Sequence, residues 1–162
     1  MKRLLAAMLL LPALAGIARA NGGAIFRSHC AACHRPDGHG VPSVYPPLAD
    51  SIGNYVRLAQ GREYLVHVVS FGMMGPISSR GQTYSGFMQP WTQFSDDDLA
   101  QVLNHVLMDF NAKLLPKGFQ PFTADEVKRD RAAKLSLSEV RNQRDVLMKA
   151  LGGAAALKAH GS

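Results

Sequence analysis

Among its 162 residues the chain contains only two cysteines, both in the segment Cys30-Ala31-Ala32-Cys33-His34. On a helix, positions i, i+3 and i+4 share one face, so the two thiols and the imidazole would point the same way. Cys-x-x-Cys-His is the attachment signature of c-type haem. The thiols can bond the two vinyl groups along one porphyrin edge, while His34 presents a ring nitrogen to iron. We therefore predict one covalently attached haem c, with Cys30 and Cys33 holding the porphyrin and His34 the iron.

Three other uses of a Cys-x-x-Cys pair explain the segment less well. A thioredoxin-like pair follows a strand and opens a helix, and no strand is predicted before Cys30. A structural zinc site needs four ligands, usually with a second Cys or His pair, and the sequence contains no such pair. A simple disulfide would leave His34 without a role.

The sequence from residue 21 to 110 predicts an all-α body with long loops. Short helices are expected over 23–33 and 62–71, and a third begins after Ser95, where Asp96, Asp97 and Asp98 favour a helix N-terminus. One apolar stripe then follows helical spacing: Leu99, Val102, Leu103, Val106, Leu107 and Phe110. Glycine and proline predict loops over 35–50 and 72–94.

This body is short of hydrophobic core. Apolar residues make up 47% of the chain and charged residues 19%, which excludes a disordered protein. However, three modest helices bury limited apolar surface. A large, flat, apolar cofactor would give the long loops something to pack against.

The first twenty residues predict a cleaved signal peptide. Lys2 and Arg3 form a basic start, an apolar stretch follows, and Ala18-Arg19-Ala20 matches the small-x-small pattern before a cleavage site. We expect cleavage after Ala20 and export to a bacterial periplasm. An uncleaved membrane anchor is the alternative, but the apolar stretch is shorter than the ~18 residues that span a bilayer.

Charge is unevenly distributed along the chain. Residues 21–110 carry five arginines, seven acidic residues and no lysine, whereas residues 111–162 carry ten basic and five acidic residues. A nucleic-acid surface would interleave basic and aromatic residues, and no such motif is present. The pattern instead predicts a nearly neutral body with a basic extension.

Residues 22–110 resemble the class I cytochromes c, which are small periplasmic electron carriers. The resemblance rests on the Cys30–His34 segment, on Tyr45-Pro46-Pro47-Leu48, and on the segment 81–91 before the acidic start of the last body helix. The family uses a methionine before that helix as the second axial iron ligand, and Met88 matches it. Many relatives have Met-Pro there, whereas this sequence has Met88-Gln89-Pro90.

The resemblance also implies supporting residues. A ligating histidine usually donates its other N–H to an oxygen, and the family uses a backbone carbonyl in the proline-containing loop. Pro46 matches the residue that supplies this carbonyl. Tyr84 resembles a loop tyrosine that approaches a haem propionate. Both residues could equally be ordinary loop packing.

Rival iron ligands remain among the other methionines and histidines. Met73 and Met74 lie in a glycine-flanked segment, and His67 lies beside valines in a predicted helix. Met108 and Met148 more commonly pack in such positions. His29, His39, His105 and His160 are expected to be solvated or satisfied by neighbours.

A His/Met-ligated iron has no open position, which predicts one-electron transfer and no enzymatic reaction. The expected protein is a periplasmic monohaem c-type cytochrome that exchanges electrons with redox partners, as the electron-accepting partner or subunit of a periplasmic dehydrogenase. The alternative is a haem enzyme or ligand sensor whose sixth iron position is open or displaceable.

Residues 111–162 exceed what a simple cytochrome needs and predict a basic helical extension. Capping boxes at Thr123 and Ser136 indicate helices over about 124–134 and 138–151. A narrow apolar seam follows the second helix: Val140, Leu147, Leu151 and Ala154. The seam fits docking onto a partner protein, which we favour, and it also fits packing back onto the body.

Overall fold

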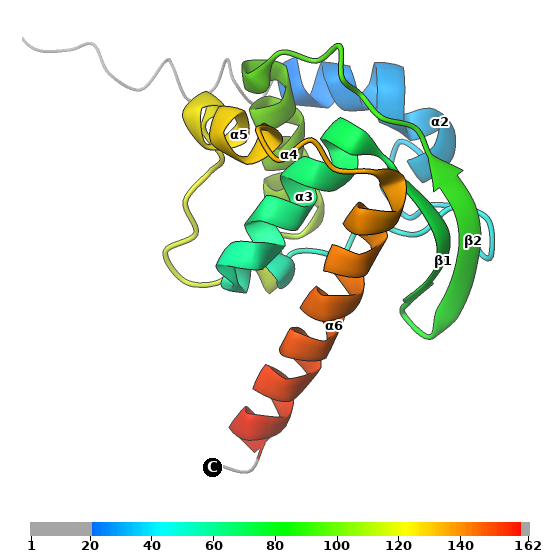
Figure 1. Ribbon diagram of the computed structural model, residues 1–162, viewed down its shortest axis with the longest axis vertical. Coiled ribbons are helices and arrows are strands. Elements are labelled where there is room, and N and C mark those ends of the chain that lie inside the picture. The colour runs from blue at the N-terminus through cyan, green and yellow to red at the C-terminus, as the bar shows by residue number, and fades with distance from the viewer. Residues whose placement is uncertain (1–20, 160–162) are drawn as a thin grey trace, which may run out of the picture.

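The computed structural model describes residues 21–159, with side chains through residue 152. Its body is mostly helical (Figure 1). Residues 21–25 begin an N-terminal helix that continues as the π-helical turn η1 (Phe26–Cys30) and as α2 (Ala31–His34). The predicted helix over 23–33 is thereby confirmed, and it ends on the histidine of the haem-attachment segment.

Two longer helices form the core of the body. The short turn η2 (Tyr55–Arg57) leads into α3 (Ala59–Phe71), and α4 spans Asp96–Phe110. Ser95 caps α4 through a capping box with Asp98, as the sequence predicted. The predicted stripe on α4 is buried from Leu99 to Leu107, where both of these leucines are fully enclosed.

The segment predicted as a long loop over 72–94 contains a β-hairpin, so the expectation of an all-α body was wrong there. Strand β1 (Met73–Ser79) pairs antiparallel with β2 (Gln82–Met88). The connection is only two residues, Arg80 and Gly81, both with positive φ. This backbone geometry matches the right-handed twist of the strands. The register places Met73 opposite Met88 at the open end of the hairpin.

The extension packs onto the body of its own chain. After the short turn η3 (Ala112–Leu114), α5 (Ala124–Arg131) contacts α3 and α4, while α6 (Leu137–Ala159) lies between α3 and β1 (Figure 1). Val127, Val140 and Leu147 are almost completely buried. These contacts bury the apolar seam that we expected to dock onto a partner, so the seam packs onto the body, as in the alternative. The side chain of Ala154 lies outside the described part.

Polar contacts reinforce the joint between extension and body. Arg62 on α3 donates to both carboxylate oxygens of Glu126 on α5, at 2.7 Å each. Arg131 reaches Asp96 at the start of α4, at 2.8 Å. In the described part of the chain, no helix combines the length and apolarity needed to cross a bilayer. The predicted signal peptide, residues 1–20, lies outside the described residues.

Candidate haem-binding site

The Cys30–His34 segment is held against α4 by the residues just before it. Phe26 is fully buried, and its ring lies 5.1 Å from that of Phe110 and 5.5 Å from that of His105. A side chain at Gly22 would clash with the backbone of Gln101, so the helix crosses α4 in direct contact. Phe26, Cys30 and His34 are spaced four residues apart, and all three line the interior cavity.

The helix ends directly after His34, and the chain turns back beneath it. Arg35 adopts φ 64°, which terminates α2. The N–H of Gly40 donates to the carbonyl of His34 at 2.9 Å. Gly40 itself has φ 66°, and any Cβ there would collide with the carbonyl oxygen of Tyr45. Only glycine therefore lets the loop return close enough to place Pro46 beside the histidine.

His34 is oriented by Pro46. Its Nδ1 lies 3.0 Å from the carbonyl oxygen of Pro46, twelve residues along the chain. A carbonyl only accepts, so Nδ1 must carry the proton, which leaves Nε2 with its lone pair free. Burial lowers the pKa of His34, although the hydrogen bond to Pro46 opposes this shift. The ring is thus held in the neutral form that binds a metal.

A cavity extends from His34 into the core. Its walls are almost entirely apolar and come from the loop after α2, from α3, from α4 and from the hairpin: Leu48, Ile52, Leu65, Val68, Val69, Ile77, Val102, Leu103 and Val106. It shares Cys30, His34, Pro46, Met73 and Met88 with an adjoining hollow that also includes Cys33. An apolar slot with two thiols, an imidazole and a thioether on its walls fits a porphyrin.

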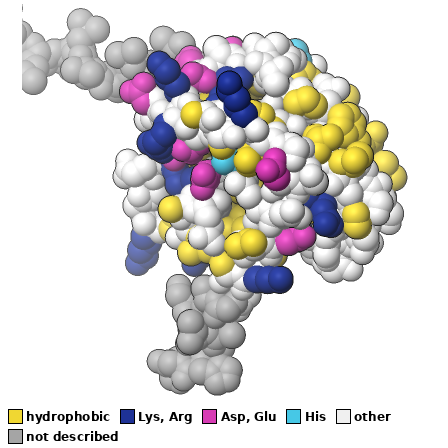
Figure 2. Space-filling model, in the orientation of Figure 1, with side chains coloured by type: hydrophobic (Ala, Val, Ile, Leu, Met, Phe, Trp, Pro, Cys, Tyr) yellow, Lys and Arg dark blue, Asp and Glu magenta, His cyan; other side chains and the backbone are white. Residues whose placement is uncertain are grey.

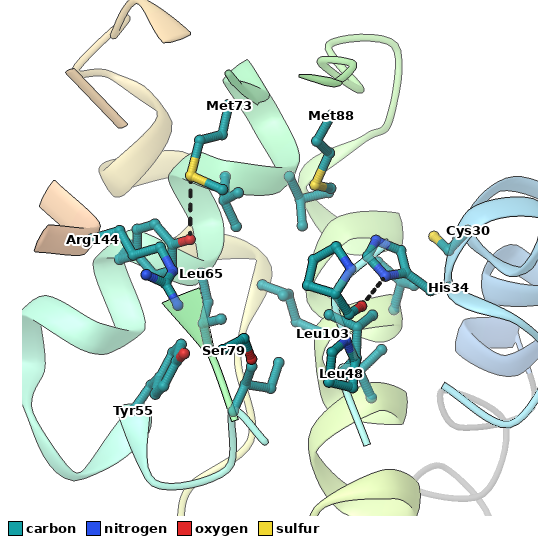
Figure 3. Close-up of a pocket in the computed structure, with 18 of the residues that line it drawn as sticks. Cys30, His34, Leu48, Tyr55, Leu65, Met73, Ser79, Met88, Leu103 and Arg144 are labelled. Carbon is teal, nitrogen blue, oxygen red and sulfur yellow. Dashed lines mark hydrogen bonds between the residues drawn. The ribbon is translucent and has the colours of Figure 1, made fainter. Parts of the chain in front are cut away.

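Met88 and Met73 both line this cavity from the hairpin (Figure 3). The sulfur of Met73 accepts a hydrogen bond from the Tyr64 hydroxyl at 3.7 Å. Met88 ends β2, and its position is fixed on both sides: its carbonyl abuts Gly72, and the Trp91 N–H donates to Val69 at 3.0 Å. The exposed Met74 lines neither cavity. Of the two cavity-lining methionines, only Met73 therefore has its sulfur engaged within the described residues.

Tyr84, Phe87 and Trp91 line the adjoining hollow. Tyr84 is buried and lines it, and the tyrosine hydroxyl lies 3.4 Å from Gln82 Oε1. Trp91 stacks on Phe94 at 5.1 Å between ring centroids. Phe87, the neighbour of Met88 in the chain, is 59% exposed. It forms part of the outer rim of the hollow.

His67, the rival histidine, has other partners. It is fully buried, with Nδ1 2.9 Å from Gln143 Oε1 and Nε2 2.8 Å from the carbonyl of Asp130. Both ring nitrogens thus bind the extension, and neither is free for a metal. Within the described residues no three His, Cys, Asp or Glu side chains gather as a metal-binding group.

The Cys30 thiol does not have the character of a redox-active group. Burial, and then the neighbouring Cys33, raises the pKa of Cys30 to about 11. Reactive Cys-x-x-Cys motifs show the opposite, a thiol pKa lowered into the neutral range. The raised pKa of Cys30 therefore disfavours thioredoxin-like chemistry.

Sequence reasoning missed two residues of the site. Arg144 on α6 lines the cavity, and Asn111 after α4 ties down the loop that supplies Leu48 and Ile52. Arg144 was detectable, since it occupies the helical stripe between Val140 and Leu147 where an apolar residue is expected. Nothing in the sequence pattern distinguishes Asn111.

Comparisons with known proteins agree with this architecture. The sequence model of the cytochrome c family matches residues 19–108. Cytochrome c-552 of Thermus thermophilus is 42% identical over 147 residues, which span 91% of this chain and 98% of the relative. The cytochrome c subunit of a quinone alcohol dehydrogenase from Gluconobacter oxydans is 34% identical over 85 residues, spanning 52% of this chain and 17% of that protein.

The match to cytochrome c-552 extends into residues 111–162, whereas the dehydrogenase subunit is similar over a shorter segment. Cys30 and Cys33 fit the family's attachment motif for haem c. The chain therefore belongs to the cytochrome c family, as a class I monohaem cytochrome with a covalently attached haem c, and it is an electron-transfer protein rather than an enzyme.

Proposed function

We propose that this protein is a one-electron carrier whose haem iron is ligated by His34 and Met88. The observation that carries the proposal is the convergence of these side chains, from α2 and from the end of β2, on one apolar cavity (Figure 3). The bound haem supplies an iron that alternates between the ferric and ferrous states. Two permanent ligands leave little rearrangement between these states, which suits electron transfer.

The protein orients His34 and excludes water from the haem cavity. The Pro46 carbonyl holds the proton on Nδ1 of His34, so that Nε2 is always presented as a lone pair. The apolar walls exclude water, and together with a neutral thioether they favour the ferrous state. The family resemblance implies a tyrosine near a propionate, and Tyr84, which lines the adjoining hollow, is the residue that matches it.

The proposed electron exit is the apolar mouth beside Cys33. Figure 2 shows hydrophobic side chains gathered on the side where the hairpin and α2 lie. Val44, Tyr45 and Phe87 line this mouth and are 51%, 36% and 59% exposed. Since the body has no lysine, a lysine ring cannot steer a partner here. A redox partner with an apolar docking face fits this surface.

The proposed partner is an electron-donating dehydrogenase in the periplasm. Support comes from the likeness to subunits of quinone alcohol dehydrogenases and from the signal-peptide pattern of residues 1–20. The extension serves such a partner only through its outer basic residues, because its apolar seam is buried. Exposed basic residues there would raise the association rate at low salt.

Carbon monoxide binding tests the axial ligands. The reduced wild-type protein should refuse the gas, and Met88→Ala should bind it rapidly because one iron position opens. Met73→Leu is the matched control and should behave as wild type. Rapid binding by the wild type would favour a ligand sensor or haem enzyme instead. If Met73→Leu opens the iron and Met88→Ala does not, the ligand assignment is wrong.

Electron transfer with the native dehydrogenase tests the docking surface. Phe87→Asp should slow the bimolecular rate because it places a charge in an apolar interface. Val146→Asp is the control: Val146 is 61% exposed, on α6, and does not line the mouth. Equal rates for both variants would reject the proposed exit.

A further inference from the structure

Arg144 places a buried positive charge in the wall of an otherwise apolar cavity. The residue is 5% exposed and lines the cavity together with Tyr55, Tyr64 and Ser79. Its Nη2 donates to the carbonyl of Ser78 on β1, at 2.6 Å. The guanidinium also interacts with the hydroxyl groups of Tyr55 and Tyr64. These contacts fix its position from three different elements.

The charge of Arg144 has no balancing partner in the described part of the protein. The carboxylates there that form ion pairs with arginines pair with Arg35, Arg62, Arg129, Arg131 and Arg141. A buried charge without an opposite charge is strongly unfavourable. Arginine in particular presents a fork of donors that matches a carboxylate. The cavity thus has a buried cation whose charge no carboxylate of the described residues balances.

The position of Arg144 relative to the thiols indicates which anionic group of the haem would contact it. Figure 3 shows Cys30 at one end of the cavity and Arg144, Tyr55 and Ser79 at the other. Haem carries its two propionate carboxylates on the edge remote from the vinyl groups. Because Cys30 and Cys33 fix the vinyl edge, the carboxylate edge is directed toward the arginine.

We propose that Arg144, supplied by the C-terminal extension, binds a haem propionate and makes α6 an integral wall of the haem site. The pair neutralises two charges that would each be costly to bury alone. It also places a fixed positive charge near the iron, which favours the ferrous state. The proposal rests on the covalent haem and does not require His/Met ligation or any particular redox partner.

Two measurements on the holo-protein test this pairing. In the reduced, diamagnetic protein, nuclear Overhauser contacts should connect the Arg144 side chain to the propionate methylene protons. Contacts of Arg144 with other haem substituents, and not with these methylenes, would overturn the proposal.

The reduction potential provides the second test. Arg144→Gln should lower the equilibrium constant for reduction about tenfold, which corresponds to about 59 mV for one electron. The effect should persist at high salt because the charge is buried. Lys149→Gln, which removes an exposed charge from the same helix, is the control and should cause little change. Equal potentials for the two variants would show that Arg144 only packs.

Arg144→Lys separates charge from geometry. A lysine keeps the positive charge but loses the bidentate fork, so it should restore only part of the potential. If the Arg144→Gln variant does not accumulate, Arg144→Lys alone tests the proposal. A reduction potential below that of the wild type supports the pairing, and an unchanged reduction potential rejects it. The carbon monoxide experiment tests only the ligation of the iron by His34 and Met88. The ligation proposal and the Arg144 proposal can therefore fail independently.

Discussion

Replacing Asn111 by alanine should destabilise the protein strongly, because one side chain organises a whole loop. Its Oδ1 accepts from the backbone N–H groups of Ser51, Ile52 and Gly53, at 3.1, 3.1 and 3.0 Å. Its Nδ2 donates to the carbonyls of Leu48 and Val106, at 3.0 and 2.9 Å. The residue is completely buried, so water cannot replace these bonds.

The expected magnitude follows from the buried groups that would lose their partner. The N–H groups of Ile52 and Gly53 are bonded in a buried setting, and each costs about 1–3 kcal/mol when left unpaired. With the weaker losses at Ser51 and Leu48, we expect about 4 kcal/mol. For a guanidinium chloride slope of roughly 3–4 kcal/mol per molar, the midpoint should fall by about 1 M.

Guanidinium chloride unfolding of the holo-protein, followed by far-ultraviolet circular dichroism, measures this change. Asn142→Ala on α6 is the matched control, since Asn142 is exposed and should shift the free energy of unfolding by less than about 0.5 kcal/mol. If Asn111→Ala and Asn142→Ala unfold at the same midpoint, Asn111 does not organise the loop.

Three further changes have definite expectations. Gly40→Ala should reduce the thermal midpoint and the yield of holo-protein, because it forces a backbone clash at a positive φ. Leu147→Ala should cost about 2–5 kcal/mol in denaturant unfolding, whereas Val146→Ala, beside it on the solvent side, should cost almost nothing. Hydrogen bonds from Ser136 lower the pKa of Glu139. The ionised carboxylate therefore stabilises the folded protein at pH values above its unfolded pKa. This stabilisation is lost as the pH falls through the pKa of the folded state. Ser136→Ala should flatten that acid limb of the stability profile, and an unchanged limb would contradict the assignment.

The attachment segment and the helices were predictable because each rests on local chemistry. The spacing of Cys30, Cys33 and His34 fixes one helix face, and Ser95 with Asp98 fixes a helix start, whatever the rest of the chain does. The pairing of His34 with Pro46 was implied by the family resemblance, and the structure places His34 Nδ1 3.0 Å from the Pro46 carbonyl oxygen. Their role at the iron remains a proposal.

The hairpin was not predictable by the same means. Its strands contain Gly75, Pro76 and Gly86, which favour loops, and its turn is Arg80-Gly81 instead of the usual Asn-Gly or Asp-Gly. Long-range packing against α6 compensates for these weak local preferences. The same dependence on distant contacts explains why the partner of the extension, its own body, could not be decided from the seam alone.

The two ends of the haem cavity lie far apart along the chain, with Cys30 near the beginning of the body and Arg144 near the end of the extension. Contacts between such distant residues form late in folding, because the chain must first pay the entropy of closing a long loop before the contacts can stabilise it. During synthesis the thiols are therefore made long before the wall opposite them exists. The cavity therefore acquires its last wall only when α6 packs against α3 and β1.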